Sequence, residues 1–396
     1  MQLDWIKPLI GIPGPFATVY LDATRGDESG YREVMNRWQG LKRSLTNQHT
    51  PEEILSLLED RISQATHATG QVGRFLIVGR GEVLVDRVMK TPPLKDEAIY
   101  AGAPALRAAA AATDDQVNYF LVEINRMGAD VKTPDPQNPF GPLEIYAQIA
   151  GEHDVVHKVR GGGFHHGRLQ NRAQDSWERN ADYIANHLDE LVTTDRPELL
   201  ILSGDVRAVG LVEERLGEPA RKISTQLPGG GRNEGAEDAH FQQQLESVLD
   251  DYRQKRRGSV IARFEQELGR DEAAVTGQED VLQALRRGQV SELLLQGDGS
   301  SSPEPEASLW IGQGALEVSD SESEVRELSD TAEELSADIA LLRAAVGQDA
   351  GVTFVNDSLT LPGGVGALLR WKDAATPDEN VLSFSDDSQR LRAEPY

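Results

Sequence analysis

The residue types best suited to chemistry are concentrated in one glycine-rich segment near the middle of the chain. Three consecutive glycines allow the backbone to adopt positive φ values and to approach a phosphate or nucleotide closely. Cations neutralise phosphate, and a phenyl or imidazole ring stacks on a base. The pattern indicates a nucleic-acid contact, with a solvated hairpin tip as the alternative. The candidate residues are Lys158, Arg160, Gly161, Gly162, Gly163, Phe164, His165, His166, Arg168 and Arg172.

The charge of this segment is opposite in sign to the charge of the whole chain. The 396 residues carry a formal net charge of −25, yet residues 155–174 contain no acid. Residues 298–338 contain twelve acids and one base, Arg326. A uniformly acidic protein is repelled by phosphate, so a nucleic-acid contact must be local. A second basic cluster consists of Arg253, Lys255, Arg256 and Arg257.

Other site chemistries fit the sequence less well. No Gly-Lys-Ser/Thr follows the glycines, which argues against a P-loop, and the dinucleotide fingerprint is also absent. His153 and His157 are four residues apart, a spacing that converges on a metal only in a helix, whereas this stretch reads as loop or strand. Ser203-Gly204-Asp205 does not match the Gly-x-Ser-x-Gly pattern of a nucleophile elbow and is interpreted as a helix cap. Without cysteine, thiol and iron–sulfur chemistry are excluded. We expect no cofactor and no metal.

Hydrophobic periodicity predicts an α/β chain. Apolar runs predict strands at 16–21, 74–79, 82–86, 118–131 (a pair), 143–149, 199–204, 290–295, 309–311 and 352–355. Helical patterns cover 31–45, the segment after Thr50, 176–192, 206–216, 238–268, 278–287 and 324–346. Thr50 is the expected N-cap of its helix. A strand–glycine–helix order at 199–206 favours a largely parallel sheet.

The order of these patterns predicts several domains. The boundaries we expect are 1–115 for an N-terminal α/β domain, 116–236 for a central domain, 237–270 for a connecting helix, 271–373 for a C-terminal α/β domain and 374–396 for a polar tail. No apolar run approaches the length of a membrane span, and the N-terminus lacks the pattern of a signal peptide. We therefore expect a cytoplasmic protein without a membrane partner.

The collinear order of several motifs resembles a known family. Met127–Asp130, Arg160–Gly163 and Leu199–Gly204 are similar to the central domain of archaeo-eukaryotic class 1 release factors and of Pelota. More closely, the chain resembles the actinobacterial branch of the bacterial relatives, which includes the Balon-like ribosome hibernation factors. Gly128–Lys132, Ser203–Arg207 and Gly363–Arg370 are the stretches that carry this likeness.

The resemblance implies a fold and a partner. It implies three domains: an N-terminal α/β domain, a central release-factor-like domain with an RNase H-like mixed sheet, and a C-terminal α/β domain of the kink-turn-binding ribosomal-protein type. A monomer of this kind occupies the ribosomal A site and contacts rRNA of both subunits. Its first domain faces the decoding centre, the central loop enters the peptidyl-transferase centre, and the third domain meets a translational GTPase, which is EF-Tu for Balon-like factors.

One departure from the family pattern bears on activity. Release factors carry Gly-Gly-Gln at the loop tip, whereas here Gly161–Gly163 are followed by Phe164, and the first glutamine is Gln170. We expect a non-enzymatic hibernation factor that blocks translation under stress. One alternative is a peptidyl-tRNA hydrolase or RNA-cleaving enzyme that uses His165 or His166 as general acid and base. Another is a stress-related protein that binds a different partner through its acidic surface.

Overall fold

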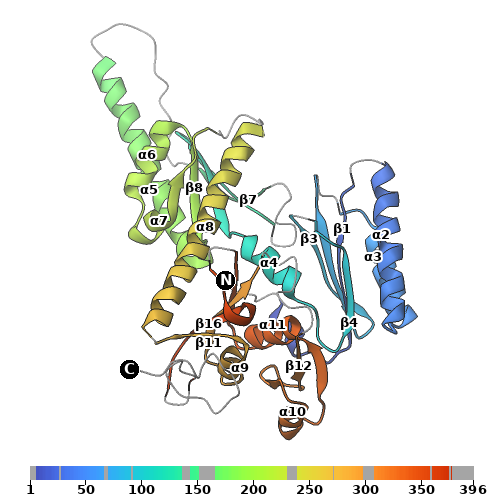
Figure 1. Ribbon diagram of the computed structural model, residues 1–396. Helices are drawn as coiled ribbons and strands as arrows, with labels where there is room; N and C mark the ends of the chain where they lie inside the picture. Colours follow the sequence, from blue (N-terminus) through green and yellow to red (C-terminus); the bar gives the residue numbers. More distant parts are fainter. Residues whose placement is uncertain are drawn as a thin grey trace. The chain divides into compact units, whose positions relative to one another are not determined.

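The chain forms two compact units (Figure 1). A computed structural model describes residues 6–25, 28–66, 70–90, 92–135, 143–150, 166–229, 239–270, 272–297, 307–356, 359–373 and 376, and at 28–29, 166–176 and 239 it describes the backbone alone. Unit 1 combines Met1–Asp115 with Gln254–Tyr396, and unit 2 is Gln116–Arg253. The chain therefore passes between the units twice. The predicted division into five segments remains a prediction.

The N-terminal part of unit 1 is an antiparallel sheet with two helices packed on it. Its strands are β1 (Phe16–Asp22), β2 (Gly73–Gly79), β3 (Glu82–Met89) and β4 (Glu97–Ala101), in the order β3-β2-β1-β4. The helices are α2 (Glu28–Asn47) and α3 (Glu52–Ser63), after a short α1 (Lys7–Ile10). Trp38 of α2 and Leu58 of α3 are fully buried against the sheet. Residues at helical spacing in α2 and α3 thus pack against alternate residues of the strands.

Thr50 does not cap α3, which corrects the expectation from the sequence. The residue before the helix is Pro51, which makes no side-chain cap. Thr50 Oγ1 is buried and has no hydrogen-bond partner among the described residues. The Thr-Pro-Glu-Glu pattern predicted a hydroxyl cap, but burial of the threonine side chain directs it away from the amides of the first turn.

The C-terminal part of unit 1 contains two small sheets. One has the order β10-β16-β11-β15 and the other β13-β12-β14. The strands are β10 (Ala274–Thr276), β11 (Val290–Gln296), β12 (Ser308–Ile311), β13 (Val318–Ser319), β14 (Glu333–Ser336), β15 (Gly351–Val355) and β16 (Val365–Leu369). The helices are α9 (Gln278–Arg286), α10 (Glu322–Leu328), α11 (Ala337–Gly347) and a 3₁₀ turn, η1 (Pro362–Gly364).

The predicted helix at 324–346 is wrong as a single element. The structure interrupts it with β14, which pairs with β12 so that Leu335 lies opposite Leu309. The spacing of apolar residues around Leu335 is compatible with a helix or with a strand. Pairing with Leu309, 26 residues earlier in the chain, stabilises the strand. The remaining helix α11 is buried almost all round, as expected of a helix that is apolar on every face.

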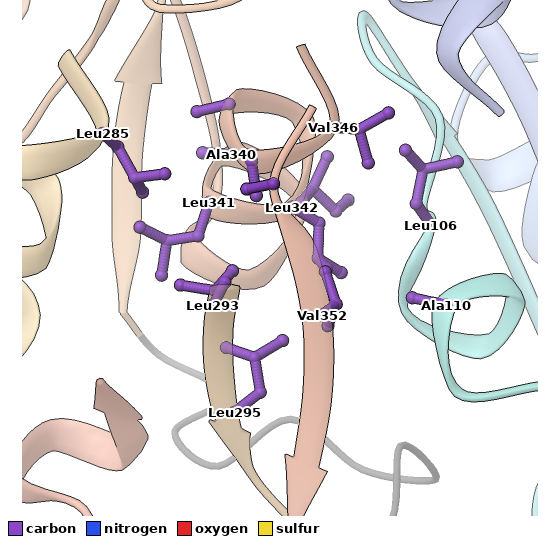
Figure 2. Packing of buried hydrophobic residues seen from close by; sticks show 14 of the residues in the cluster. Leu106, Ala110, Leu285, Leu293, Leu295, Ala340, Leu341, Leu342, Val346 and Val352 are labelled. Carbon is purple, nitrogen blue, oxygen red and sulfur yellow. The ribbon is translucent and has the colours of Figure 1, made fainter. Parts of the chain in front are cut away.

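One continuous core joins the two parts of unit 1. Figure 2 shows Ala110 of α4 (Arg107–Asp115) and Leu106, the residue before this helix, near Leu342 and Val346 of α11. All four side chains are fully or almost fully buried in the same cluster, which also contains Phe16 of β1. Residues 1–115 and 271–373, predicted as separate domains, therefore share one hydrophobic core.

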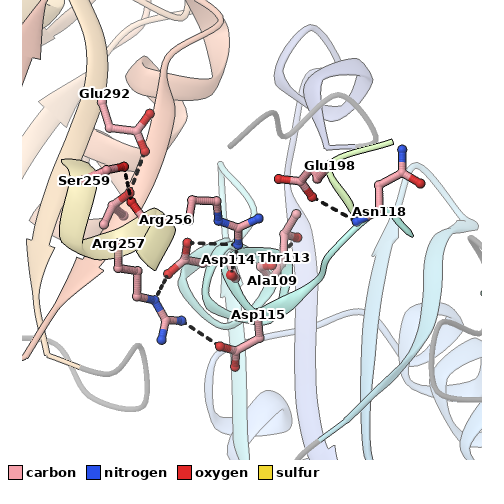
Figure 3. Close-up of polar contacts among 11 residues, drawn as sticks. Ala109, Thr113, Asp114, Asp115, Asn118, Glu198, Arg256, Arg257, Ser259 and Glu292 are labelled. Carbon is pink, nitrogen blue, oxygen red and sulfur yellow. Dashed lines mark hydrogen bonds and ion pairs between the residues drawn. The ribbon is translucent and has the colours of Figure 1, made fainter. Parts of the chain in front are cut away.

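The end of α4 is tied to the long helix α8 (Ala239–Gly269) by buried charge (Figure 3). Asp114 is 1% exposed and accepts from Arg257 Nε at 2.7 Å, while Arg256 lies 3.7 Å from its other carboxylate oxygen. Arg257 Nη2 also reaches Asp115 Oδ1 at 2.6 Å. Burial opposes the charge of Arg257, but the adjacent carboxylates outweigh it and raise the pKa of the guanidinium.

These ion pairs change the interpretation of the second basic cluster. Arg256 and Arg257 neutralise Asp114, and Arg253 is paired with Asp250 and lies 3.8 Å from Glu246. Three of the four cations in the cluster are therefore engaged within the protein. A run of basic residues on a helix is commonly a nucleic-acid patch, but here it holds the helix in place.

Unit 2 is a five-stranded mixed sheet with helices on both faces. The strands β5 (Tyr119–Asn125), β6 (Gly128–Thr133), β7 (Glu144–Ala150), β8 (Leu199–Gly204) and β9 (Ser224–Gln226) have the order β7-β6-β5-β8-β9. β5, β8 and β9 are parallel, and β6 and β7 are antiparallel to their neighbours. The largely parallel sheet predicted from 199–206 holds for both pairings of β8, whereas the other two pairings of the sheet are antiparallel. The helices are α5 (His166–Asp195), α6 (Val206–Arg215) and α7 (Glu218–Ile223).

Alternate residues of β5 face two different helical layers. Phe120, Val122 and Ile124 pack with α5 and α6 in one core. Tyr119 and Leu121 pack in the other with the first half of α8. Both faces of a central strand are thus buried, which explains its nearly continuous apolar sequence. In the described part of the chain no helix is both long and apolar enough to cross a membrane.

Gly204 allows the end of β8 to lie directly on β5. Its φ is +121°, a conformation that side chains with a Cβ rarely adopt, and a Cβ at this position would lie 2.0 Å from the carbonyl oxygen of Ile124. The next amide, that of Asp205, donates to the same oxygen at 2.9 Å. The chain can turn from β8 into α6 at this point only because residue 204 has no side chain.

We expect Gly204→Ala to lower the free energy of unfolding by about 3 kcal/mol or more, from backbone strain and from collision with Ile124. Gly210→Ala is the matched control, because Gly210 lies inside α6 and a Cβ added there would meet no atom within 4 Å. It should raise stability by about 0.5–1 kcal/mol. Urea denaturation of both variants measures the difference. Equal stabilities would show that the close approach is unimportant.

We expect Asp114→Ala to cost about 3 kcal/mol or more, since it leaves two arginines beside α4 without their buried carboxylate. Asp115→Ala removes a neighbouring carboxylate whose side chain is 44% exposed, so its loss should cost less than about 1 kcal/mol. Chemical denaturation compares the two. A small effect of Asp114→Ala would contradict the structural role given to the pair.

Candidate nucleic-acid interface

The structure places the predicted contact residues unequally. Lys158, Arg160, Gly161, Gly162, Gly163, Phe164 and His165 lie outside the described residues, as do His153 and His157. His166, Arg168 and Arg172 belong to α5, of which only the backbone is described at these positions. The helix thus begins ten residues before the predicted start at Ser176. What the structure does define is the pair of elements between which residues 151–165 run, β7 and α5.

The chain leaves β7 beside the turn between β5 and β6. In the register of the sheet, Ala150 is the partner of Gly128, the first residue of β6. The turn itself is held by Asn125, whose side-chain oxygen accepts from the amides of Met127 and Gly128 at 2.8 and 3.0 Å. This is the local hydrogen bonding for which asparagine is favoured in turns.

The chain returns past the same turn in α5. Asn180 Nδ2 donates to the carbonyl oxygen of Arg126 at 3.1 Å. The guanidinium carbon of Arg126 lies 4.3 Å from the centre of the Trp177 ring, a cation–π contact. Beyond it, Ala181, Ile184 and their neighbours are buried against the sheet. Trp177 is the most N-terminal side chain of α5 that the structure describes.

The start of α6 completes this corner. Asp205 caps the helix, accepting from the amides of Arg207 and Ala208 at 3.0 and 3.2 Å, which confirms the cap predicted for Ser203–Asp205. A carboxylate in this position also interacts favourably with the helix dipole. Its second oxygen lies 3.1 Å from Arg126 Nη2. Arg126 therefore links the turn, α5 and α6.

We call this arrangement the loop base and define it as Asn125–Gly128, Trp177, Asn180 and Gly204–Arg207. Its surface is partly apolar, because Met127 is 57% exposed and Val206 83% exposed. Arg207 is exposed, and the side chain of Arg126 is 41% exposed. Asp205, the acid of the loop base, is engaged with amides and with Arg126. Such a surface suits a phosphate-rich partner better than a cationic one.

Unit 1 contains a cleft of ≈ 880 Å³. Two charged side chains, Arg343 and Glu333, line this cleft, and both form hydrogen bonds with backbone groups. Arg343 donates to the carbonyl oxygens of Gly312, Gln313 and Gly314 at 3.0, 2.7 and 3.0 Å, and burial lowers the pKa of its guanidinium. Glu333 accepts from the amide of Gly102 at 2.8 Å. Both charged side chains of the cleft are thus engaged with backbone groups.

Metal ligands do not converge in the described residues. Nowhere in that part of the chain do three or more histidine, aspartate or glutamate side chains lie close enough to hold a metal ion. The chemistry of the loop base is accordingly that of charge and stacking. It contains Arg126, Arg207, Trp177 and the carboxylate of Asp205 that caps α6, and none of its residues is a histidine.

Sequence reasoning missed the central residue of this site. Arg126 is one residue of a hairpin turn, and nothing near it in the sequence shows that its partners are Trp177 and Asp205, 51 and 79 residues later. The available signal was the co-occurrence of the two stretches Met127–Asp130 and Ser203–Arg207 in the family resemblance. The structure brings both to the same end of the sheet.

Comparison with known proteins agrees with this resemblance. The sequence model of the bacterial archaeo-eukaryotic release factor family 2 matches residues 118–270. The uncharacterized protein Rv2629 of Mycobacterium tuberculosis H37Rv is 26% identical over 374 residues, covering 94% of this chain and 97% of its own. The uncharacterized protein MT2704 of M. tuberculosis CDC 1551 gives the same figures.

The solved structures that the chain matches include two Pelota proteins. The archaeal Pelota in a model of ribosome-bound Pelota and ABCE1 is 14% identical, with 93% of this chain and 94% of that chain covered and a TM-score of 0.38. Archaeoglobus fulgidus Pelota is also 14% identical, with 78% and 86% covered and a TM-score of 0.32. Residues 118–270 are therefore similar to the bacterial archaeo-eukaryotic release factor family 2, and the matched segment includes every residue of the loop base.

Proposed function

We propose that this protein binds the ribosome and acts as a hibernation factor. The observation that carries the proposal is that the acid-free segment 155–174 of an otherwise acidic chain lies within the family match and runs between two elements fixed at the loop base. The rRNA around the A site is a dense array of phosphates. A local cationic segment on an acidic body binds such a target without binding nucleic acid indiscriminately.

The charge of the described residues supports this choice of segment. Arg253, Arg256 and Arg257 are engaged by carboxylates within the protein. Lys132 pairs with Glu123 at 2.8 Å, and Arg215 pairs with Asp182 at 2.6 Å. Cations held in this way contribute little to a phosphate partner. Segment 158–172 therefore provides the main RNA contact, and it reaches the peptidyl-transferase centre when the protein occupies the A site.

The remaining parts of the proposal follow from the likeness to Balon-like factors. Residues 1–115 face the decoding centre, and the C-terminal region meets EF-Tu. The protein acts as a monomer in the cytoplasm during stress. Since the glutamine of Gly-Gly-Gln is replaced after Gly163 by Phe164, it occupies the site without hydrolysing peptidyl-tRNA.

The RNA contact is tested by reversing charge in segment 158–172. We expect Arg160→Glu with Arg168→Glu to weaken co-sedimentation with ribosomes at least tenfold and to flatten the salt dependence of binding by roughly one to two units of log Kd per log salt, because two phosphate contacts are lost. The control, Lys222→Glu with Arg263→Glu, changes the net charge equally at exposed positions on α7 and α8. If both double variants bind alike, the segment is not the contact.

The absence of hydrolysis is tested with ribosomes that carry peptidyl-tRNA. We expect the purified protein to release no peptide above the spontaneous rate. Peptide release that His165→Ala or His166→Ala abolishes, while His240→Ala on α8 leaves it intact, would instead establish the hydrolase alternative. His240 serves as the matched histidine because it lies outside the basic segment.

A further inference from the structure

Arg126 contacts two helices, α5 and α6, through its backbone carbonyl group and its guanidinium. Its carbonyl oxygen accepts from Asn180 of α5 at 3.1 Å, and its guanidinium carbon lies 4.3 Å from the ring centre of Trp177. Its Nη2 is 3.1 Å from Asp205, the cap of α6. Nε is buried and has no hydrogen-bond partner among the described residues, so the face of the guanidinium on the indole is one of its principal contacts.

These contacts lie where α5 meets the sheet. The fully buried side chains of α5 that belong to the core begin at Ala181. From Trp177 back to His166 the helix continues for eleven residues, or about 16 Å at 1.5 Å per residue. A helix of that length acts as a lever. A tilt of about 10° at Trp177 displaces its beginning by about 3 Å, the length of a hydrogen bond.

The segment at the end of this lever carries His166, Arg168 and Arg172. An arginine recognises a phosphate through two parallel hydrogen bonds, a geometry that a displacement of 3 Å destroys. We infer that Arg126 is a positioning residue: by stacking on Trp177 and pairing with Asp205, it sets the direction in which the first three turns of α5 present their cations to RNA. The inference rests on the proposed ribosome contact of that segment.

The other contacts between α5 and α6 do not replace this one. Arg215, at the end of α6, pairs with Asp182 at 2.6 Å and lies 3.9 Å from Glu178. Arg215 joins the two helices to each other, whereas Arg126 joins both of them to the turn between β5 and β6. Without Arg126, α5 and α6 remain packed on each other, but their common orientation relative to β5 and β6 is less constrained.

The experiment compares two substitutions of Trp177 in the full-length protein. Trp177→Phe keeps an aromatic face for the guanidinium, and Trp177→Leu removes it, while both lose the indole N–H. A photoreactive benzoylphenylalanine at Gln170 reports where α5 lies on ribosomal RNA, through the nucleotides to which it cross-links. Denaturation midpoints show that each variant is folded at the assay temperature.

We expect Trp177→Phe to cross-link to the same nucleotides as the parent protein. Trp177→Leu and Arg126→Gln should shift the cross-linked nucleotides or spread them over more positions, with about a tenfold rise in Kd. Lys132→Gln is the control, because it breaks a 2.8 Å ion pair with Glu123 in the same sheet without touching α5. Its cross-links should be those of the parent.

A purely structural role for Arg126 predicts a different result. The stability of Arg126→Gln and Trp177→Leu would fall, but the folded molecules would cross-link to unchanged nucleotides with unchanged Kd, and the inference would be wrong. The proposed function fails separately: in that case the parent protein itself does not bind ribosomes, or reversing Arg160 and Arg168 leaves binding intact. If Arg126→Gln does not fold, the two Trp177 variants alone decide.

Discussion

The close approach of β8 to β5 is the constraint on which the rest of the central unit depends. The two strands pair in parallel from Tyr119 opposite Leu199 to Ile124 opposite Gly204. At that last position the carbonyl oxygen of Ile124 lies where a Cβ of residue 204 would be. Glycine lets the chain turn immediately into α6, so that Asp205 is placed over the β5–β6 turn. A longer turn would move the cap away from Arg126 and leave α6 without this tie to the β5–β6 turn.

The positive charge that this protein exposes depends more on which arginines form internal ion pairs than on how many the chain contains. The chain carries a net charge of −25, and many of its arginines are used internally. Asp114 draws Arg256 and Arg257 onto α4, and Arg343 holds three carbonyl groups in unit 1. Ion pairs of this kind remove positive charge from the surface. Segment 155–174 has no acid of its own, which is why we propose it as the place where a phosphate-rich partner is attracted.

Much of the local structure was accessible from the sequence because local rules govern it. The apolar run 199–204 is the central strand β8, and Asp205 caps the helix that follows. Where a distant partner decides, the local pattern failed. Leu335 belongs to a strand because Leu309 pairs with it, and Thr50 does not cap α3 because its hydroxyl is buried elsewhere. The pairing of Arg126 with Trp177 and Asp205 likewise spans three elements that no sequence window contains.

The sequence by itself determined the chemical character of the candidate contact: a run of glycines, cations and histidines without acids, and a missing glutamine after Gly163. These are properties of neighbouring residues, and no fold is needed to read them. The tertiary structure alone decided that the second basic cluster is engaged by carboxylates and which contacts hold the turn between β5 and β6 to α5 and α6. Arg256 and Arg257 meet Asp114 only because α4 and α8 lie together, and Arg126 meets Asp205 only because β8 ends beside β5. Charge pairing and stacking act over a few ångströms, and only folding brings residues fifty or more positions apart within that range.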